Sequence, residues 1–351
     1  MTKSLQLAAP TVQAFVAEIF AAAGSSPREA SLLASHLVEA SLAGHDSHGI
    51  GMLPTYVDSA QNGELKLNQS LRTVSDLGAI LMTDGQRGVG QVMAHDAMCL
   101  GIERARVAGL ALVGLSDAFH IGRIGAYAEQ AVAAGLVSLH FVNVLSEPQV
   151  APFGGKVARL GTNPIAIGIP RAGAEPIIID MATSRWAIGK VRVAHNKGEK
   201  LPPGILLDSQ GETSLDPGDI FGVPKGALTT FGEHKGWCFA LAAELLGAAL
   251  VGGITQSRPK TRPELINSML TILISPERLG TVEHFARETD ALVAWVQSDE
   301  NGQPSRVKLP GDPERKYRED RRVAGLPIDR VTWNQILAAA RSVGLEHDPA
   351  R

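Results

Sequence analysis

The stretch from Leu110 to Ala134 constrains the fold of this chain more than any other part. It opens with an apolar run, Leu110 to Leu115, of the length expected for a buried strand, and it closes with helical spacing from Gly125 to Ala134. Polar side chains, His120 among them, lie at the junction. A strand that turns into a helix presents such groups at a sheet edge, where enzymes of mixed structure commonly bind ligands. His120 is therefore a candidate for chemistry; the alternative is a histidine that only hydrogen-bonds within the turn.

Size, composition and charge narrow the class of protein. With 351 residues the chain is long enough for two domains, or for one domain with an elaborate appendage. Hydrophobic residues make up 44% and charged residues 20%, as in ordinary soluble globular proteins. The net charge of −3 argues against binding to nucleic acid or to an anionic membrane. Residues 1–10 lack a signal-peptide pattern and no apolar stretch could span a bilayer, so we expect a cytoplasmic protein.

The two cysteines agree with that location. Cys99 and Cys238 lie far apart in the sequence, and both fall in expected helices. We interpret them as small buried hydrophobic side chains in a reducing compartment, and not as a disulfide or a metal-binding pair.

The N-terminal region is expected to be helical. Residues 11–23 and 27–43 form two amphipathic helices, and a third helical pattern runs from Ile50 to Gln61. The second helix has Ser26 as its N-cap and Pro27 at its first position. We expect Glu29 to complete a capping box with Ser26.

A polar cluster between glycines follows the second helix, in the order Gly44-His45-Asp46-Ser47-His48-Gly49. Two histidines and an aspartate in one tight turn suggest an acid–base site or a metal site. The metal interpretation is the weaker one, because no partner cluster of Cys or His has the usual ligand spacing.

The middle of the chain carries a glycine-rich loop but no standard nucleotide-binding motif. Short strands are expected from Leu65 to Thr83, and the loop Asp84 to Gln91 then opens a helix that runs to about Val107. The loop lacks the Lys-Ser/Thr pair of a P-loop, and Gly-x-Gly-x-x-Gly occurs nowhere between a strand and a helix. A nicotinamide cofactor would therefore not bind in a Rossmann site.

Two positions further along suit a dinucleotide. The strand Ile177 to Asp180 ends in a carboxylate that could bind a ribose or orient a catalytic group; the alternative is that Asp180 only caps the next turn. Lys235 lies at the start of a long apolar helix that ends near Leu250. A helix N-terminus with an added positive charge favours a phosphate, and the alternative is a solvated lysine.

The order of the expected elements predicts how the domains are built. Further strands are expected over residues 136–144 and 269–275, and further helices over 281–296 and 331–343. Both ends of the chain are helical and the middle is mixed. We therefore expect a helical domain made of residues 1–75 with 312–351, and a cofactor-binding mixed α/β domain of residues 76–311. The charged segment Gly311 to Ala324 is interpreted as a solvated helix face.

Six short motifs carry a resemblance to a known family. They are Asp46-Ser47-His48-Gly49, His120-Ile121-Gly122, Pro152-Phe153-Gly154-Gly155, Gly161-Thr162-Asn163-Pro164, Asp180-Met181-Ala182-Thr183-Ser184 and His234-Lys235-Gly236. In this order, over nearly the whole chain, they resemble the non-Rossmann NAD(P)-dependent 2-hydroxyacid dehydrogenases, the malate/L-lactate, ureidoglycolate and sulfolactate dehydrogenase family. The longer strings SHGIGMLPTYV and HIGRIG are similar to its bacterial hydroxycarboxylate dehydrogenases.

The resemblance implies a fold and a set of partners. The fold would be α+β, with a helical domain from both termini and a mixed domain built on a largely antiparallel sheet. The protein would be a homodimer that holds NAD or NADP in the cleft between its domains. Its substrate would be a small 2-oxo or 2-hydroxy acid, and no metal, nucleic acid or membrane would be involved.

The resemblance also implies roles for individual residues. His120 would be the acid–base residue, and His48 would line the nicotinamide and substrate cleft. The dinucleotide would contact Gly122, Arg123, Ile124, Ile178, Ile179, Asp180, Met181, Ala182, His234, Lys235 and Asn267.

The sequence departs from the family at two places. Pro313, Glu314, Arg315 and Lys316 occupy a position that touches cofactor in close relatives, but those relatives carry an aromatic and aliphatic run there. Met52 stands where many members have an arginine that binds the substrate carboxylate. A thioether in place of a charged group should tolerate a larger and more apolar substrate side chain.

These observations favour an oxidoreductase that moves a hydride between NAD(P)H and a 2-oxo acid, such as phenylpyruvate or 2-oxoglutarate. Reduction of the carbonyl develops negative charge on oxygen, and histidine is suited to supply the proton. Four alternatives stay open at this point. They are a dehydrogenase of a small malate- or lactate-type acid, a cyclic imine reductase, a metal-dependent hydrolase built on His45, Asp46, His48 and His120, and a non-catalytic ligand-binding protein.

Overall fold

A seven-stranded sheet lies at the centre of the protein. The structure is a computed structural model that describes residues 4–258, 265–299 and 301–350. The strands follow the order β2 (Arg72–Asp76), β3 (Ile80–Asp84), β4 (Leu110–Phe119), β11 (Ile266–Ile274), β5 (Val137–Leu145), β6 (Ile165–Ile169) and β7 (Ile177–Met181). The pair β3–β4 is parallel and the other neighbouring pairs are antiparallel. The α+β class with a largely antiparallel sheet is confirmed.

The strand β4 is longer than the sequence indicated. The expected strand ended at Leu115, whereas β4 continues through Ser116 and Asp117 to Phe119. The polar residues remain in the strand because β4 pairs with β3 on one side and with β11 on the other. His120 is therefore the first residue after the strand, and α5 (Gly125–Ala133) begins five residues later.

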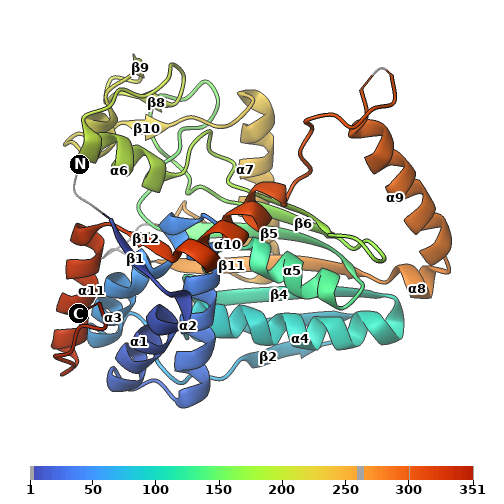
Figure 1. Cartoon of the computed structure of the whole chain (residues 1–351), viewed down its shortest axis with the longest axis horizontal. Coiled ribbons are helices and arrows are strands. Elements are labelled where there is room, and N and C mark those ends of the chain that lie inside the picture. The colour runs from blue at the N-terminus through green and yellow to red at the C-terminus, as the bar shows by residue number, and fades with distance from the viewer. Residues whose placement is uncertain (1–3, 259–264, 300, 351) are drawn as a thin grey trace.

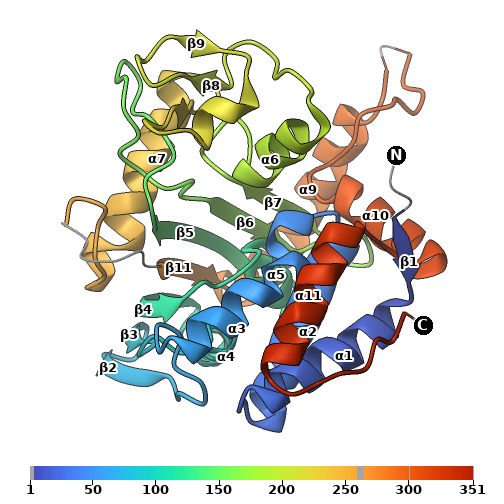
Figure 2. The ribbon, with the colours of Figure 1, turned by 90° about the vertical axis from the view of Figure 1, so that its left-hand side faces the viewer.

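Helices cover both faces of the sheet, as Figure 2 shows. On one face lie α4 (Gly90–Ala108) and α5, and on the other lies α7 (His234–Gly247). Two glycines permit the close approach. A Cβ on Gly101 of α4 would lie 2.6 Å from the Val113 side chain, and one on Gly247 of α7 would lie 2.7 Å from the Phe141 carbonyl oxygen.

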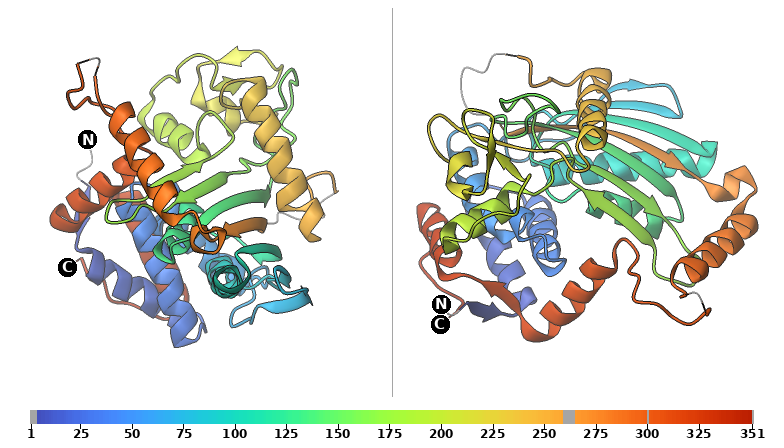
Figure 3. Two further views of the ribbon diagram at one scale, coloured as in Figure 1. Left: turned by 90° about the vertical axis from the view of Figure 1, so that its right-hand side faces the viewer. Right: turned by 90° about the horizontal axis from the view of Figure 1, so that it is seen from above.

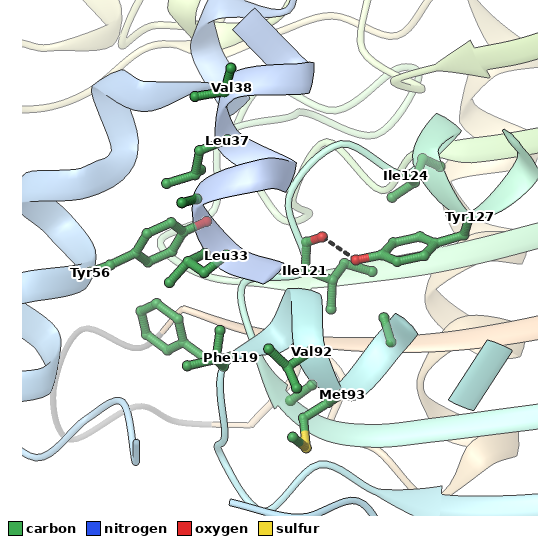
Figure 4. Close-up of a cluster of buried hydrophobic side chains, with 14 of the residues drawn as sticks. Leu33, Leu37, Val38, Tyr56, Val92, Met93, Phe119, Ile121, Ile124 and Tyr127 are labelled. Carbon is green, nitrogen blue, oxygen red and sulfur yellow. Dashed lines mark hydrogen bonds between the residues drawn. The ribbon is translucent and has the colours of Figure 1, made fainter. Parts of the chain in front are cut away.

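The two ends of the chain pack together beside the sheet (Figure 1). The short strands β1 (Leu5–Leu7) and β12 (Leu326–Ile328) pair, and the helices next to them are α1 (Ala9–Ala22), α2 (Pro27–Leu42), α3 (Leu53–Gln61), α10 (Asp312–Ala324) and α11 (Arg330–Ser342). Buried side chains of α1, α2, α3 and α11 join those of the sheet and of α4 and α5 in one core cluster, part of which is shown in Figure 4. The exact boundaries of the two expected domains stay a prediction.

The start of α2 differs from the expected capping box. Ser26 is the N-cap and accepts a hydrogen bond from the Glu29 N–H, as expected. The Glu29 carboxylate does not return to Ser26, because it accepts hydrogen bonds from the Ser25 hydroxyl and from the Asn68 N–H. The Ser26 N–H donates to the Asn68 side-chain oxygen instead, at 2.6 Å. A loop distant in sequence thus completes the cap.

A smaller unit with its own core follows β7. It contains α6 (Ile188–Lys197) and a three-stranded sheet of β8 (Leu206–Leu207), β9 (Thr213–Ser214) and β10 (Ala227–Leu228). Its buried residues, such as Val191 and Leu206, form a second cluster with Val150 from the segment between β5 and β6. The helix α6 was not predicted from the sequence. The expectation that both cysteines are buried is wrong, because Cys238 is exposed on α7 and Cys99 is half-buried on α4.

The remaining helices are α8 (Pro276–Leu279) and α9 (Val282–Val296), which follow β11. In the part of the chain that the structure describes, no helix is long and apolar enough to cross a membrane.

Candidate active site

His120 is placed by close packing at the end of β4. The first residue of α4, Gly90, lies so near that a Cβ on it would be 2.1 Å from the Phe119 carbonyl oxygen and 2.4 Å from that of His120. The next residue is also fixed, because the Ile121 N–H donates to the side-chain oxygen of Asn267 at 2.9 Å. His120 is only 8% exposed as a result.

The structure brings His48 and His120 together. His48 ends the 3-10 turn Asp46–His48, and its ring stacks on that of His120 with 5.6 Å between the centroids. Its Nδ1 lies 2.9 Å from the Ser47 hydroxyl. His48 is half-buried, so the pair consists of one buried imidazole and one that solvent can reach.

Two residues that the sequence analysis did not single out hold His120. The Tyr56 hydroxyl lies 2.6 Å from His120 Nδ1, and the Gln91 Nε2 donates to that hydroxyl at 2.7 Å. Tyr56 comes from α3 and Gln91 from the first turn of α4. In the sequence, Tyr56 is one of several residues on the buried face of a helix, so no local pattern indicates a functional role for it. The other ring nitrogen of His120, Nε2, makes no hydrogen bond to a described residue.

Burial controls the charge of both histidines. It lowers the pKa of His120 to about 3, and the neighbouring His48 and His36 act in the same direction. Burial also lowers the pKa of His48 to about 4, against a smaller opposing effect of Asp180. Both rings are therefore neutral at neutral pH in the protein alone. A substrate carboxylate beside them would favour the protonated form.

The turn after His120 is tied to α2 and to β7. The Arg123 N–H donates to His36 Nε2 at 3.0 Å, and Gly122 allows this because its φ is +75° and a Cβ would lie 2.5 Å from that nitrogen. The Gly125 N–H donates to the Asp180 carboxylate at 3.0 Å. Asp180 therefore binds the first turn of α5 across the sheet edge.

Several of the residues implied for dinucleotide binding already make ion pairs or hydrogen bonds with other residues of the protein. Arg123 is 3% exposed and contacts Glu129 at 2.5 Å and Asp180 at 3.5 Å. The Asn267 amide accepts from Ile121 and donates to the Asn143 carbonyl at 3.0 Å. Ile124 and Ile178 are buried, whereas Ile179, Met181 and Ala182 are half-buried. Cofactor contact by these residues stays a prediction.

His234 and Lys235 lie exposed in the first turn of α7. The His234 ring packs edge-on against Phe153 at 5.9 Å, which joins two of the six motifs. The N–H groups of Lys235 and Gly236 donate to carbonyl groups of the preceding turn. A phosphate here would therefore meet the side chains of His234 and Lys235 and the field of the helix, and not these two N–H groups.

The segment Pro313–Lys316 forms the first turn of α10. Glu314 reaches His45 at 3.3 Å, Arg315 donates to the Pro176 carbonyl at 3.0 Å, and Lys316 pairs with Asp320 at 2.5 Å. Of the four, Glu314 approaches the turn that carries His48. The interpretation of α10 as a solvated face is wrong for part of the helix, because the mostly buried Arg318 and Arg321 contact Glu129 and Asp46.

The alternative of a metal-dependent hydrolase loses its support. His45 contacts Glu314, Asp46 contacts Arg321, and His120 contacts Tyr56. Among the described residues, no group of three or more His, Cys, Asp or Glu side chains could hold a metal ion.

A groove of about 490 Å³ lies elsewhere, between α3, α6 and α11. Thr55, Asp58, Gln61 and Arg192 are among its lining residues, and neither His48 nor His120 is. The histidine pair, where polar groups converge on a buried imidazole, is the candidate site.

Comparisons with known proteins agree with this fold. Residues 7–337 match the family described as malate/L-lactate dehydrogenase. Hydroxycarboxylate dehydrogenase B of Escherichia coli K12 is 45% identical over 97% of this chain and 95% of its own length. Malate/(S)-sulfolactate dehydrogenase of Methanothermus fervidus is 32% identical over 95% of this chain and 97% of its own.

Solved structures show the same fold. A putative malate/lactate dehydrogenase from E. coli superposes with a TM-score of 0.92 at 44% identity, over 97% of this chain and 96% of that chain. A delta1-piperideine-2-carboxylate reductase from Pseudomonas syringae gives a TM-score of 0.83 at 31% identity, over 95% and 99% of the two chains. The chain belongs to the malate/L-lactate dehydrogenase family and is an oxidoreductase.

Proposed function

We propose that this protein reduces 2-oxo carboxylic acids to 2-hydroxy acids with NADH or NADPH, and catalyses the reverse reaction, with His120 as the acid–base residue. The observation that carries the proposal is the histidine pair. His120 has Nδ1 fixed by Tyr56 and leaves Nε2 without a partner among the described residues. The stacked ring of His48 marks the side from which a substrate would approach.

The residues present fit a nicotinamide dinucleotide. A flat, half-exposed imidazole, His48, lies against the acid–base residue and suits the nicotinamide ring. Exposed His234 and Lys235 at a helix N-terminus suit a phosphate. When bound, the reduced cofactor supplies the hydride. His120 Nε2 then gives its proton to the carbonyl oxygen, and in the reverse direction the same nitrogen accepts it.

Catalysis by His120 is tested by replacing it with asparagine, which keeps a polar side chain but cannot transfer a proton near neutral pH. We expect kcat to fall by at least roughly a hundred-fold, while cofactor binding and the circular-dichroism spectrum stay unchanged. His48→Asn should have the smaller effect if His48 mainly positions substrate and nicotinamide. An inactive His48 variant beside a nearly normal His120 variant would reverse the two roles.

The substrate is expected to be bulky. Met52 is half-buried near the start of α3 and gives no charge to a substrate carboxylate. We therefore expect phenylpyruvate or 2-oxoglutarate to give a higher kcat/KM than pyruvate or oxaloacetate, with no loss of activity in EDTA. A ranking led by pyruvate would favour a small-acid dehydrogenase. Because a solved relative at 31% identity is named a piperideine-2-carboxylate reductase, that cyclic imine belongs in the same screen.

We infer further that the protein is a homodimer, from two apolar surfaces that the chain leaves uncovered. One is a row of half-buried side chains across five strands on the α7 face of the sheet, formed by Leu112, Ile272, Leu139, Ile167 and Ile179. The other is α9, in which Trp295 and Leu292 are 75% and 59% exposed and Val293 is buried. Figure 3 shows α9, in orange, standing apart from the helices that cover the sheet.

The part of this sheet face that α7 leaves open and the apolar side of α9 are complementary, so a second copy can cover both. We expect light scattering to give the mass of a dimer for the wild type and a shift toward monomer for Trp295→Ser. Val323→Ser, at an exposed apolar position of α10, is the control and should not shift the mass. A monomeric wild type at micromolar concentration would contradict the proposal.

A further inference from the structure

Three buried residues, one from α3, one from α4 and one directly after β4, form a continuous hydrogen-bond chain behind the site. Gln91, Tyr56 and His120 are 2%, 1% and 8% exposed. The Gln91 Nε2 lies 2.7 Å from the Tyr56 hydroxyl, which lies 2.6 Å from His120 Nδ1. Figure 4 shows the Tyr56 ring inside the apolar cluster.

The number of available donors determines where the Tyr56 and His120 protons lie in this arrangement. An amide NH₂ can only donate, so the Tyr56 oxygen accepts from Gln91 and the single hydroxyl proton points at His120 Nδ1. Nδ1 is then an acceptor, and neutral His120 carries its proton on Nε2. The other end of the amide, Gln91 Oε1, is buried and has no hydrogen-bond partner among the described residues.

The cationic form of His120 needs the opposite arrangement. An imidazolium carries protons on both nitrogens, so its Nδ1–H must find an acceptor. The Tyr56 oxygen can accept that proton only if its own hydroxyl proton turns away. Gln91 offers the acceptor for it, because rotating the amide by half a turn exchanges Nε2 for the unpaired Oε1.

We propose that Tyr56 and Gln91 are positioning residues that switch His120 between its neutral and cationic forms by reversing the direction of this hydrogen-bond chain. The inference rests on the proposed acid–base role of His120. With the amide turned, Tyr56 donates to Gln91 and accepts from His120 Nδ1–H, so both protons of the imidazolium are directed, one inward and one to the substrate.

The proton balance follows from this arrangement. In reduction, the Nε2 proton passes to the carbonyl oxygen, which gains a bond to hydrogen while the N–H bond breaks. His120 is left neutral, with its Nδ1–H still hydrogen-bonded to the Tyr56 oxygen. Nε2 then takes up a new proton from solvent. Tyr56 keeps its own proton throughout, because burial raises the pKa of its hydroxyl well above the usual range and disfavours a tyrosinate.

Among the residues that the structure describes, no other group near His120 duplicates this function. His48 faces it from the 3-10 turn and His36 from α2, and both pKa values lie below the ordinary range, at about 4 and 3. The charges of Arg123 and Asp180 act on His48 rather than on the Nδ1 side of His120. Neither histidine hydrogen-bonds to His120 Nδ1, which Tyr56 occupies.

The test is the pH dependence of kcat for reduction, whose falling limb at high pH reports the loss of the His120 proton in the complex with substrate and cofactor. Tyr56→Phe removes the acceptor of the buried Nδ1–H, so we expect the limb to move to lower pH by about one unit or more. Gln91→Glu supplies only acceptors, so the limb should move to higher pH. The KM for the oxo acid should change much less than kcat.

Tyr127→Phe is the matched control. Tyr127 is another buried tyrosine of the same cluster, and its hydroxyl donates to the Ile121 carbonyl and not to His120 (Figure 4). We expect this variant to lose stability without moving the pH limb. Equal shifts in Tyr56→Phe and Tyr127→Phe would reduce Tyr56 to a packing role and overturn the proposal.

A second measurement does not depend on activity. Nitrogen-15 NMR of labelled histidine, with the His120→Asn variant to assign the signal, distinguishes the two neutral tautomers. We expect Nε2–H in the wild type and a mixture in Tyr56→Phe; Nδ1–H in the neutral wild type would overturn the proposal. If His120→Asn stays active, the proposed function itself fails. If it is inactive while Tyr56→Phe and Gln91→Glu match the wild type, only the switch fails.

Discussion

Arg123 shows how a residue implied for cofactor binding can be committed to the fold. Its guanidinium is 3% exposed between Glu129 and Asp180, and Asp180 also accepts from the Gly125 N–H. Two carboxylates balance its charge, so little of it is left for a phosphate. Removing either partner would leave a buried charge uncompensated, which is strongly destabilising.

Lys235 is the opposite case, because it is exposed at the start of α7. We expect Lys235→Ala to weaken cofactor binding, measured by NADH or NADPH fluorescence titration, by a few-fold to about tenfold, since an exposed charge contributes on the order of 1 kcal/mol. Lys66→Ala, at an exposed position in the loop before β2, is the control. Equal cofactor affinities in the two variants would mean that Lys235 is a solvated surface residue with no part in cofactor binding.

The sequence could predict part of the site and not the rest. His48 and His120 stand in polar clusters at element ends, which local patterns mark as candidates. Tyr56 and Gln91 lie on buried helix faces, where tyrosine and glutamine have many uses. Their role follows only from the meeting of α3 and α4 with the end of β4, and that meeting depends on close contacts such as the one at Gly90.

At the scale of elements, helices were predicted better than short strands. Periodicity identified α1, α2, α4, α7, α9 and α11 to within a few residues. The strands β1 and β12 were not predicted, because a strand of three residues shows no measurable periodicity and each of the two exists only as the partner of the other. The length of β4 was also underestimated, because pairing with strands on both sides keeps its polar residues in the sheet.

The helix α10 connects the C-terminal part of the chain to the site. Arg321 is 13% exposed; it contacts the Ser41 carbonyl and Asp46, and Asp46 opens the 3-10 turn that ends in His48. We expect Arg321→Ala to lower the free energy of unfolding by about 1–2 kcal/mol and to raise the KM for the oxo acid, because that turn loses its anchor. Chemical denaturation and steady-state kinetics measure the two effects.

The adjacent Arg322 supplies the control for that experiment. Its side chain is 60% exposed and lies 3.7 Å from Glu39. Exposed pairs of this kind contribute little, so Arg322→Ala should change stability by less than roughly 0.5 kcal/mol and leave KM unchanged. Similar KM values in the two variants would show that α10 does not position His48.

At the scale of the whole molecule, another buried histidine lies within the central sheet. His140 lies on β5, on the face covered by α4 and α5, between the Thr271 hydroxyl at 2.9 Å and the Ser138 hydroxyl at 3.0 Å. Burial lowers its pKa to about 3. His36, His48 and His120 have lowered pKa values as well, so four imidazoles must stay neutral in the folded protein.

This arrangement predicts that acid destabilises the protein well above the pH at which its carboxylates titrate. Between pH 6.5 and 3 the unfolded chain binds protons at these histidines and the folded chain does not, so the free energy of unfolding falls as the pH falls. For His140 alone the loss from pH 6.5 to pH 4.5 is about 2–3 kcal/mol, at 1.36 kcal/mol per unit. His140→Gln, which keeps a neutral polar group that does not titrate, should be less stable at pH 7.5 but should lose less stability on acidification. Urea titrations at pH 7.5, 6.0 and 4.5 give both slopes, and parallel slopes for the two proteins would mean that His140 is protonated in the folded state.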